Sequence, residues 1–450
     1  MRNNNLQKKA YLGAIWTVLG FGLSQGLRLG GNIILTRLLL PDVFGLMALS
    51  YVFIRGLNLF SDVGIVPSIV RHERGDEPTF LDTAWTIQVI RGMVQCLGCF
   101  IIAWPVANFY NEPLLLKIIP LLGVGVALRG CQSTSLATLR RNMELKKITL
   151  FEFSTQTAAL LMTIVLTFMM RSVWALVIAN LLGDLFRCIL SHFLIKNYRR
   201  KFAWEKEALR EFMTFGRWIL LSSILTFAAG QTDRLLLGKI FTTEILGIYT
   251  IAVTFAELQK AVTLKVNQSV LFPLFSKALI KNSRSALKSK VTAKRSLLLL
   301  ALIGLVNLLF NFGDVLIYVL YDERYYDAAW MLPILAVGLW PMLLYITVDP
   351  ILLAVGKPIY GTIANLGKVV YMLIFIPLAN QTFGLIGVIA AIALNDIPTY
   401  AVNNWGLWRE KFSTFGQDLK YSALLVLAIL ITALIRYQLG FGFSLSGFFS

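Results

Sequence analysis

Basic residues inside apolar stretches are the feature of this sequence that most directly suggests chemistry. They lie well within runs of apolar residues long enough to cross a bilayer: Arg28, Arg55, Arg91, Arg129, Arg187, Arg234, Lys260 and Lys265. A charge at membrane depth costs several kcal/mol, about 2.5 to 3.5 on insertion scales. A chain that keeps so many of them needs a polar interior to hold them. Because bases outnumber acids in these runs, we expect the interior to receive an anionic cargo.

The acids in the same runs have two interpretations, as ion-pair partners of the basic residues or as proton or cation sites that couple transport to a gradient. The candidates are Asp62, Glu152, Asp184, Asp233 and Glu257. Asp184 and Glu257 each have a base three residues further along, Arg187 and Lys260, which can share a helical face with them. For these two an ion pair is the simpler reading, whereas the other three have no such helical partner and stay open between the two roles.

Composition assigns the whole chain to the membrane. Of its 450 residues, 57% are hydrophobic and 15% are charged, and the mean hydropathy is +0.70, whereas soluble proteins average about 25% charged residues. Since about 20 apolar residues in a helix cross a bilayer, we expect thirteen spans, at 11–36, 43–69, 83–109, 114–138, 148–170, 172–195, 213–238, 244–270, 296–320, 328–354, 358–380, 383–408 and 418–437. The first is expected to be a retained helix, because no small-residue cleavage site follows it.

The basic residues of the short loops predict the orientation. They gather on alternate loops, including six between Lys196 and Arg210 and seven between Lys277 and Arg295. Lys and Arg stay on the cytoplasmic side, so the N-terminus is expected to be cytoplasmic. This asymmetry accounts for most of the net charge of +18, and no nucleic-acid partner is needed to explain it. The same basic loops could lie against anionic membrane lipids.

Cysteine and histidine give no evidence of a cofactor or a metal. The four cysteines, at positions 96, 99, 131 and 188, all fall within predicted spans, where a thiol usually packs as a small apolar group. Cys96 and Cys99 have a C-x-x-C spacing without a second pair of ligands. We therefore expect no metal site, no cofactor and no histidine-based catalytic group.

The sequence repeats itself once. Arg37-Leu-Leu-Leu-Pro-Asp-Val-Phe-Gly45 and Lys239-Ile-Phe-Thr-Thr-Glu-Ile-Leu-Gly247 share one pattern at a separation of 202 residues. A second similarity links Ile119-Pro-Leu-Leu-Gly-Val-Gly125 to Leu332-Pro-Ile-Leu-Ala-Val-Gly338, and Tyr110-Asn-Glu112 to Tyr321-Asp-Glu323. Each half holds six spans, so the two are parallel repeats, a transporter arrangement in which one half rocks against the other.

The predicted architecture is therefore an all-α integral membrane protein with two six-helix bundles around a central cavity, plus one to two C-terminal helices. We divide the chain into an N-lobe at 1–195, a basic cytoplasmic linker at 196–212, a C-lobe at 213–408, and a C-terminal span with an apolar tail at 409–450. The tail from Leu439 to Ser450 is too short to cross, and is expected to be interfacial or the start of a fourteenth span.

Several short motifs together resemble a known family. They are Arg37 to Gly45, Asp62-Val-Gly64, Leu271-Phe-Pro273, Tyr321-Asp-Glu-Arg-Tyr325 and Val355-Gly-Lys-Pro358. The chain is similar over essentially its whole length to Wzx-type polysaccharide flippases of the multidrug/oligosaccharidyl-lipid/polysaccharide exporter superfamily. The resemblance implies that sugars linked to undecaprenyl pyrophosphate are flipped or exported across the bacterial inner membrane, with a polysaccharide polymerase and glycosyltransferases as associated proteins.

The charges and the resemblance agree about the cargo. Guanidinium groups bind phosphate oxygens in a planar, two-pronged geometry, so a pyrophosphate can be held in the interior while its polyprenyl tail stays in lipid. The candidate pyrophosphate and sugar contacts are Arg28, Arg55, Arg91, Arg129, Arg234 and Lys260. The 202-residue offset pairs Arg55 with Glu257, which suggests that the N-lobe holds phosphate and the C-lobe carries the coupling carboxylate.

Two other functions stay open on the sequence. A multidrug or organic-cation antiporter of the same superfamily would share the two-lobed plan, although its cavity should be rich in acids. A membrane-embedded sugar polymerase, ligase or acyltransferase would need a catalytic cluster outside the membrane. The non-cytoplasmic loops are only a few residues long and the cytoplasmic ones hold few acids, so no paired-carboxylate or histidine site can form there, and we expect no enzyme.

Overall fold

The structure is a computed structural model that describes residues 2–195, 201–267 and 284–442. These residues form helices joined by short turns, with no strand among them. Four parts of the sequence predictions lie outside the described residues. They are residues 196–200 of the linker, 268–270 of the eighth span, the Leu271-Phe-Pro273 motif and 443–450 of the tail.

The chain divides into two compact units, Met1–Phe227 and Ala228–Ser450. The helices of the first unit are α1 (Arg2–Leu38), α2 (Pro41–Phe60), α3 (Ile65–Arg71), α4 (Pro78–Tyr110), α5 (Leu115–Gly130), α6 (Ser135–Arg141), α7 (Leu145–Met170) and α8 (Val173–His192). Helix α9 (Lys206–Ile240) begins in the first unit and continues into the second. Residues 206–212 of the predicted linker are therefore the first turns of a long helix.

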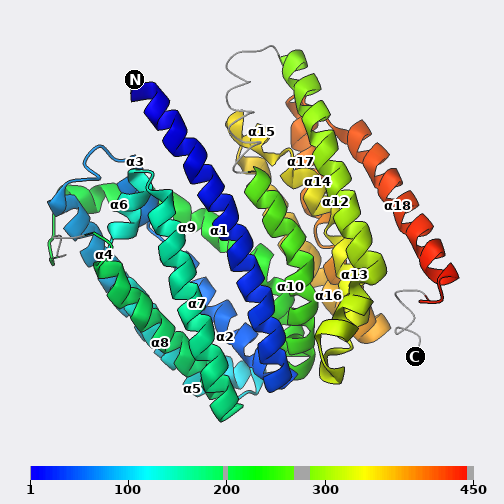
Figure 1. The fold of residues 1–450 in the computed structure, drawn as a ribbon, viewed down its shortest axis with the longest axis horizontal. Helices are drawn as coiled ribbons and strands as arrows, with labels where there is room; N and C mark the ends of the chain where they lie inside the picture. The colour runs from blue at the N-terminus through cyan, green and yellow to red at the C-terminus, as the bar shows by residue number, and fades with distance from the viewer. Residues whose placement is uncertain (1, 196–200, 268–283, 443–450) are drawn as a thin grey trace. The chain divides into compact units, whose positions relative to one another are not determined.

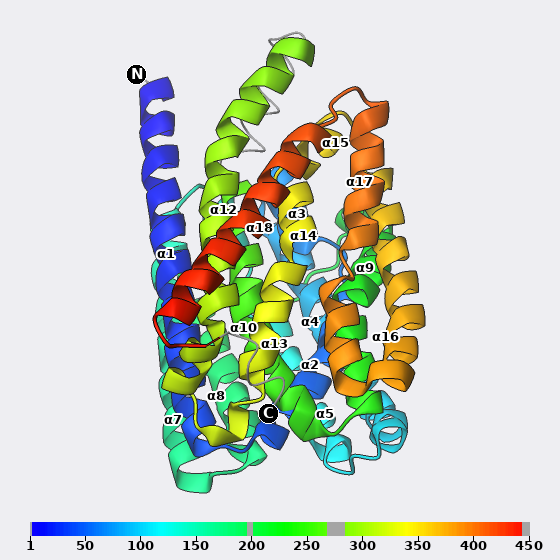
Figure 2. The same ribbon diagram turned by 90° about the vertical axis from the view of Figure 1, so that its right-hand side faces the viewer.

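The second unit contains α10 (Thr243–Val266), α12 (Arg284–Leu320), the short 3₁₀ turn η2 (Glu323–Tyr325), α13 (Ala328–Gly338), α14 (Trp340–Ile346) and α15 (Asp349–Ala354). It ends with α16 (Ile359–Ala393), α17 (Ile397–Arg409) and α18 (Phe415–Gln438). In the first unit α1 lies alongside α7, and in the second α16 and α17 lie side by side (Figures 1 and 2).

The predicted spans correspond to these helices. Among the described residues, nine helices are long and apolar enough to cross a membrane, or ten if α5 and α6 count as one span bent by 53°. One of the nine, Ile359–Arg409, is 51 residues long and divides at Gly384. Helices α1 and α9 have 37 and 35 residues but are less apolar, because polar groups interrupt them. The prediction of an all-helical membrane protein with two bundles is confirmed.

Two backbone breaks near the predicted spans lie at glycines. Gly64 (φ 67°) separates α2 from α3, and Gly384 (φ 57°) separates the two halves of α16. Both angles lie in the left-handed region that favours glycine, and the ψ of −142° at Gly384 is one that residues with a side chain rarely adopt. The sequence placed the second break at residues 381–382, close to Gly384. It predicted a single span over 43–69, whereas the helix stops at Phe60 and restarts at Ile65.

The internal repeat appears in the structure as matching breaks. Two residues separate α1 from α2, and two separate α9 from α10, at the paired motifs Arg37 to Gly45 and Lys239 to Gly247. The paired glycines Gly125 and Gly338 are both sites of close approach. A Cβ built on Gly125 would lie 2.6 Å from Asp184 of α8, and one on Gly338 would lie 2.5 Å from Ala393 of α16. Small residues allow membrane helices to pack this closely.

Candidate functional site

A polar cavity of about 400 Å³ lies inside the first unit, between α1, α7 and α8. Its polar lining consists of Ser24, Arg28, Glu152, Thr155, Gln156, Thr163, Asn180, Asp184 and Arg187. On α1 and α8 these residues are three or four positions apart, and on α7 they are one, three or seven apart, so on each helix they lie on one face. The helices expose this polar face to each other because the chain places charged and amide groups where an apolar core would otherwise form.

Small residues and one hydrogen bond hold the three helices at this spacing. A Cβ on Gly183 of α8 would lie 3.1 Å from Ala159 of α7, and one on Gly31 of α1 would lie 2.4 Å from Leu160. The side chain of Gln156 donates a hydrogen bond to the carbonyl oxygen of Ser24 at 3.1 Å. The cavity is therefore bounded by tight contacts between neighbouring helices, within which its charged groups are positioned.

Most charges of this cavity have partners on other helices. The carboxylate of Asp184 lies 3.4 Å from Nε of Arg129 on α5, and that of Glu152 lies 3.3 Å from Arg140 on α6. Arg187 lies over the ring of Phe151, 5.4 Å from its centroid. Arg28 differs, because it makes no ion pair or hydrogen bond with any residue that the structure describes. An arginine free to bind a ligand thus faces a polar cavity.

Helix α2 places a further arginine close to this region. The hydroxyl of Tyr51 donates a hydrogen bond to Oδ1 of Asn180, a cavity residue, at 2.8 Å. Arg55 follows four residues later on the same face of α2, is exposed, and has no ion pair within the described part of the chain. Arg55 is not part of the cavity lining, but it lies one helical turn from a residue that contacts it.

Arg91 and Asp62 lie outside this cavity and contact each other. Nη1 of Arg91 is 3.5 Å from Oδ1 of Asp62, and the same guanidinium donates hydrogen bonds to Ser61 Oγ at 3.1 Å and to the carbonyl oxygen of Asn58 at 2.8 Å. These contacts tie the middle of α4 to the end of α2. Asp62 therefore has a basic partner, although none was visible at helical spacing in the sequence.

A second, smaller polar cavity lies inside the second unit. Its volume is about 70 Å³, enough for a few water molecules. The charged residues of its lining are Asp233 on α9, Glu257 and Lys260 on α10, Lys368 on α16, and Asp396 in the turn before α17. Three carboxylates and two amines thus meet in this bundle, whereas the first cavity has two carboxylates and two guanidinium groups.

Most charged groups of the second cavity are also paired. The hydroxyl of Tyr249 donates a hydrogen bond to Oδ2 of Asp233 at 2.6 Å, and Nζ of Lys368 lies 2.7 Å from Oδ1 of Asp396. The Lys368 and Asp396 side chains are only 13% and 3% exposed. Arg234, beside the cavity, has its guanidinium 3.8 Å from the carboxylate of Glu257.

The structure therefore brings the candidate residues together in two groups. The first unit gathers Arg28, Arg129, Glu152 and Asp184, with Arg55 nearby, and the second gathers Asp233, Arg234, Glu257 and Lys260. The helical pairs expected at a spacing of three are not the closest contacts, because Asp184 approaches Arg129 and Glu257 approaches Arg234. The sequence interpretation missed Lys368 and Asp396, although both are charges within apolar spans and the same rule would have found them.

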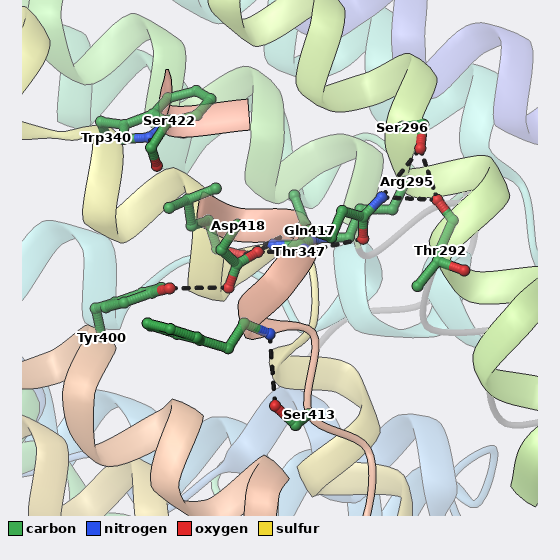
Figure 3. Close-up of polar contacts among 12 residues, drawn as sticks. Thr292, Arg295, Ser296, Trp340, Thr347, Tyr400, Ser413, Gln417, Asp418 and Ser422 are labelled. Atoms are coloured by element: carbon green, nitrogen blue, oxygen red, sulfur yellow. Dashed lines mark hydrogen bonds and ion pairs between the residues drawn. The ribbon is translucent and has the colours of Figure 1, made fainter. Parts of the chain in front are cut away.

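Two further ion pairs fix α18 to the second unit. Arg295 of α12 is fully buried and lies 2.5 Å from Oδ1 of Asp418 on α18. It also donates hydrogen bonds to Thr347 and Gln417, while Tyr400 donates one to Asp418 (Figure 3). Arg295 was counted with the basic cytoplasmic loop, but the structure buries it.

The second of these pairs lies near the other end of α18. Nη2 of Arg436 on α18 is 2.5 Å from Oδ2 of Asp314 on α12, and both side chains are buried. Between the two pairs, the side chain of Asn307 donates a hydrogen bond to Oγ1 of Thr432 at 2.9 Å. The signs are opposite at the two ends, since α12 supplies a base and then an acid, and α18 supplies an acid and then a base.

No metal site follows from the described residues, in which no group of three His, Cys, Asp or Glu side chains could hold an ion. The four cysteines are free thiols.

These features define a polytopic membrane protein of two helical bundles, each with its own charged cavity, and solved structures share this fold. The lipid II flippase MurJ, in an inward closed conformation, matches with a TM-score of 0.71 at 15% identity, over 94% of this chain and 92% of that chain. An inward-facing multidrug resistance transporter of the MATE family in the MOP superfamily matches with a TM-score of 0.69 at 15% identity, over 87% and 97%. At such low identity these likenesses establish the fold alone.

Sequence comparison establishes the family. The sequence model described as polysaccharide biosynthesis protein matches residues 34–330, and the chain belongs to that family. The lipopolysaccharide biosynthesis protein WzxC of Escherichia coli strain K12 is 24% identical over 79% of this chain and 70% of its own length. The succinoglycan biosynthesis transport protein ExoT of Rhizobium meliloti strain 1021 is 20% identical over 93% of this chain and 84% of its own length. The resemblance to polysaccharide flippases is thereby confirmed.

Proposed function

We propose that this protein flips a polyprenyl-pyrophosphate-linked oligosaccharide from the cytoplasmic to the outer leaflet of the bacterial inner membrane, for the synthesis of a surface polysaccharide. The family, the names of the relatives and the fold shared with a lipid II flippase support this function. The observation that carries it is the 400 Å³ polar cavity of the first unit, into which Arg28 projects without a protein partner.

The cavity has the chemistry that such a cargo requires. A pyrophosphate cannot enter the apolar bilayer core without compensation of its charge. Arg28 and Arg187 line the cavity, and their guanidinium groups can each hold two phosphate oxygens. Gln156 and Asn180 supply amide groups for sugar hydroxyls, while the polyprenyl chain stays in lipid. Arg129 and Arg55, at the edge of this group, are proposed as further contacts along the path.

The second unit is proposed to couple the movement to an ion gradient. Its small cavity collects Asp233, Glu257 and Lys260 beside Arg234, a group that can take up or release a cation or proton more easily than it can admit an oligosaccharide. Arg91 and Asp62, which contact each other outside both linings, are proposed to hold α4 against α2.

Both bundles enter the membrane from the cytoplasm, where the N-terminus lies, and they alternate access to the two sides. No chemical step is required, so the protein is not an enzyme. Glycosyltransferases would supply the cargo and a polysaccharide polymerase would consume it.

Replacing Arg28 tests this function. Reconstituted in liposomes, the wild-type protein is expected to move a fluorescent lipid-linked oligosaccharide between leaflets. Arg28→Gln removes a charge-assisted contact worth about 1.5 to 3 kcal/mol, so transport should fall roughly ten- to a hundred-fold at equal protein level. Arg324→Gln, in the turn η2 where Arg324 contacts Asp322, is the matched control and should keep the wild-type rate. Equal transport by Arg28→Gln and wild type would refute the assignment.

A multidrug antiporter is the second candidate, and the three carboxylates of the second cavity favour it. Such a protein should bind cationic dyes and ignore lipid pyrophosphates. Titration of the purified protein with both kinds of ligand separates the two functions, because we expect saturable binding only of the lipid pyrophosphate.

A further inference from the structure

Asp184 occupies the position in the first cavity where a bound anion would meet arginine. Its carboxylate lies 3.4 Å from Nε of Arg129 and its side chain is 19% exposed. A Cβ on Gly125, one turn before Arg129 on the same face of α5, would come within 2.6 Å of Asp184 Oδ2. The glycine therefore leaves room for this carboxylate between α8 and α5, beside the guanidinium.

Charged and titratable groups approach Asp184 from each of the surrounding helices. Arg129 approaches it from α5, and Tyr51, on α2, interacts electrostatically with both Asp184 and Arg129. Arg187 follows on α8, while Arg28 on α1 and Glu152 on α7 share the cavity lining. The four charges of the lining cancel, with two guanidinium groups and two carboxylates. Each of the two carboxylates also pairs with a guanidinium group from a helix outside the lining, Arg129 or Arg140, and such pairing lowers the cost of keeping charges inside a membrane.

A phosphate entering this cavity would compete with Asp184 for the same guanidinium groups. Both are oxyanions with the planar or tetrahedral oxygen geometry that arginine binds. A carboxylate displaced from its base at membrane depth would be an uncompensated charge next to a second anion. Taking up a proton from water removes this charge, because the neutral carboxyl group needs no ionic partner.

We propose that Asp184 substitutes for the cargo phosphate in the empty cavity and binds a proton when the phosphate displaces it from Arg129. The exchange breaks one ion pair, forms another and moves one proton from water to the Asp184 carboxylate, with no covalent change. It rests on the proposed function, since it requires a phosphate-bearing cargo. It assigns proton binding to the cargo site itself, in addition to any coupling in the second unit.

Calorimetric binding tests this exchange. The probe is farnesyl-pyrophosphoryl-N-acetylglucosamine, a pyrophosphate diester, which does not titrate near neutral pH. It is added to the full chain in lipid nanodiscs, in buffers of different ionisation enthalpy, from about pH 6 to about pH 8. The wild type should take up roughly one proton per bound probe, and its affinity should fall about tenfold per pH unit as the pH rises, because proton uptake and binding are linked.

Asp184→Asn should bind the probe without proton uptake and with an affinity independent of pH. Asp62→Asn is the matched control, because Asp62 contacts an arginine of the same unit at 3.5 Å but lies outside the cavity; it should retain the wild-type uptake. The inference is wrong if the wild type binds the probe without taking up a proton, or if Asp184→Asn still takes up a proton on binding. Either result would contradict the role of Asp184 but not the assignment of the cavity as the cargo site. Absence of probe binding to the wild type would instead overturn the cargo site itself.

Discussion

Acids in the predicted spans have their basic partners on other helices. Asp62, Glu152, Asp184 and Glu257 lie 3.5, 3.3, 3.4 and 3.8 Å from Arg91, Arg140, Arg129 and Arg234. An unpaired charge is expensive at membrane depth, whereas a paired one that lines a polar cavity can be retained. Each pair therefore neutralises a charge and joins two segments of the bundle.

The Arg295–Asp418 pair gives a stability prediction at this scale. Asp418→Asn leaves the guanidinium of Arg295, which is fully buried, without its counter-charge. Removing one partner of a buried pair costs about 3 to 5 kcal/mol, so thermal unfolding in detergent should occur at a clearly lower temperature. Asp76→Asn is the comparison, since Asp76 is 57% exposed in its pair with Arg141 and such pairs contribute about 0 to 1 kcal/mol. Equal losses in both variants would contradict the prediction.

The residue types of the site could be predicted from the sequence, but their partners could not. Charges in apolar spans identified Arg28, Arg129, Asp184 and Glu257, because their cost in a bilayer is independent of the fold. Their partners depend on which helices are neighbours. Arg295 and Asp418 are 123 residues apart, and only the packing of α12 against α18 brings them together. Helical spacing reports contacts within one helix and is silent about these.

The start of α9 is an element whose position the sequence did not indicate. Arg74 forms ion pairs with Glu77 at 2.7 Å and Glu205 at 2.6 Å, which raise the pKa of its guanidinium. The ring of Phe212 packs 4.9 Å from that of Phe80. Two backbone N–H groups in the segment, those of Ala203 and Glu205, donate to threonine hydroxyls of α4. The segment 201–212 is therefore fastened to the first unit.

Weakening the contacts that hold residues 201–212 against the first unit should speed amide hydrogen exchange in this segment. Glu205→Gln removes the charge that contacts Arg74 but keeps the side-chain shape. Because partly exposed ion pairs contribute little, we expect a roughly two- to five-fold faster amide exchange in residues 201–206. Glu207→Gln is the control, since Glu207 is 85% exposed and 3.9 Å from Arg74, and its exchange should match the wild type. Unchanged exchange in Glu205→Gln would show that apolar packing alone holds the segment.

The presence of the helices could be predicted from the sequence, whereas the breaks within them were harder to predict. The thirteen apolar runs match helices because hydropathy and length determine whether a segment crosses a membrane. The stop between Phe60 and Ile65 was missed because Ser61 to Gly64 contains too few polar residues to break a hydropathy pattern. It depends on a single glycine angle, which hydropathy does not record.

At the scale of the whole molecule, the repeat gives two bundles of one plan with different interiors. The first cavity is about 400 Å³ and the second about 70 Å³. Arginines predominate as bases in and around the first, whereas two lysines line the second together with three carboxylates. The first bundle therefore has a cavity with room for a phosphate and a sugar. The cavity of the second bundle has room only for small ions or water.

The difference between the two cavities predicts that cargo binding and the response to an ion gradient can be impaired separately. Glu257→Gln should leave binding of the lipid-linked oligosaccharide close to the wild-type affinity while making transport in liposomes independent of an imposed ion gradient. Arg28→Gln should show the reverse, with weakened binding and a residual rate that still responds to the gradient. Measuring affinity and gradient response in both variants checks the prediction, and it fails if Glu257→Gln weakens binding as much as Arg28→Gln.

Helix α18 meets α12 through an acid at one end and a base at the other, with a polar contact between them. Reversing the direction of α18, or sliding it by a turn, would put like charges together or leave buried charges alone. The charged residues of α18 therefore determine its direction and its register against α12. A version of the protein ending before Phe415, co-expressed with α18 as a separate peptide, should reassemble in a single orientation, which makes this helix a natural place to split the protein for complementation assays.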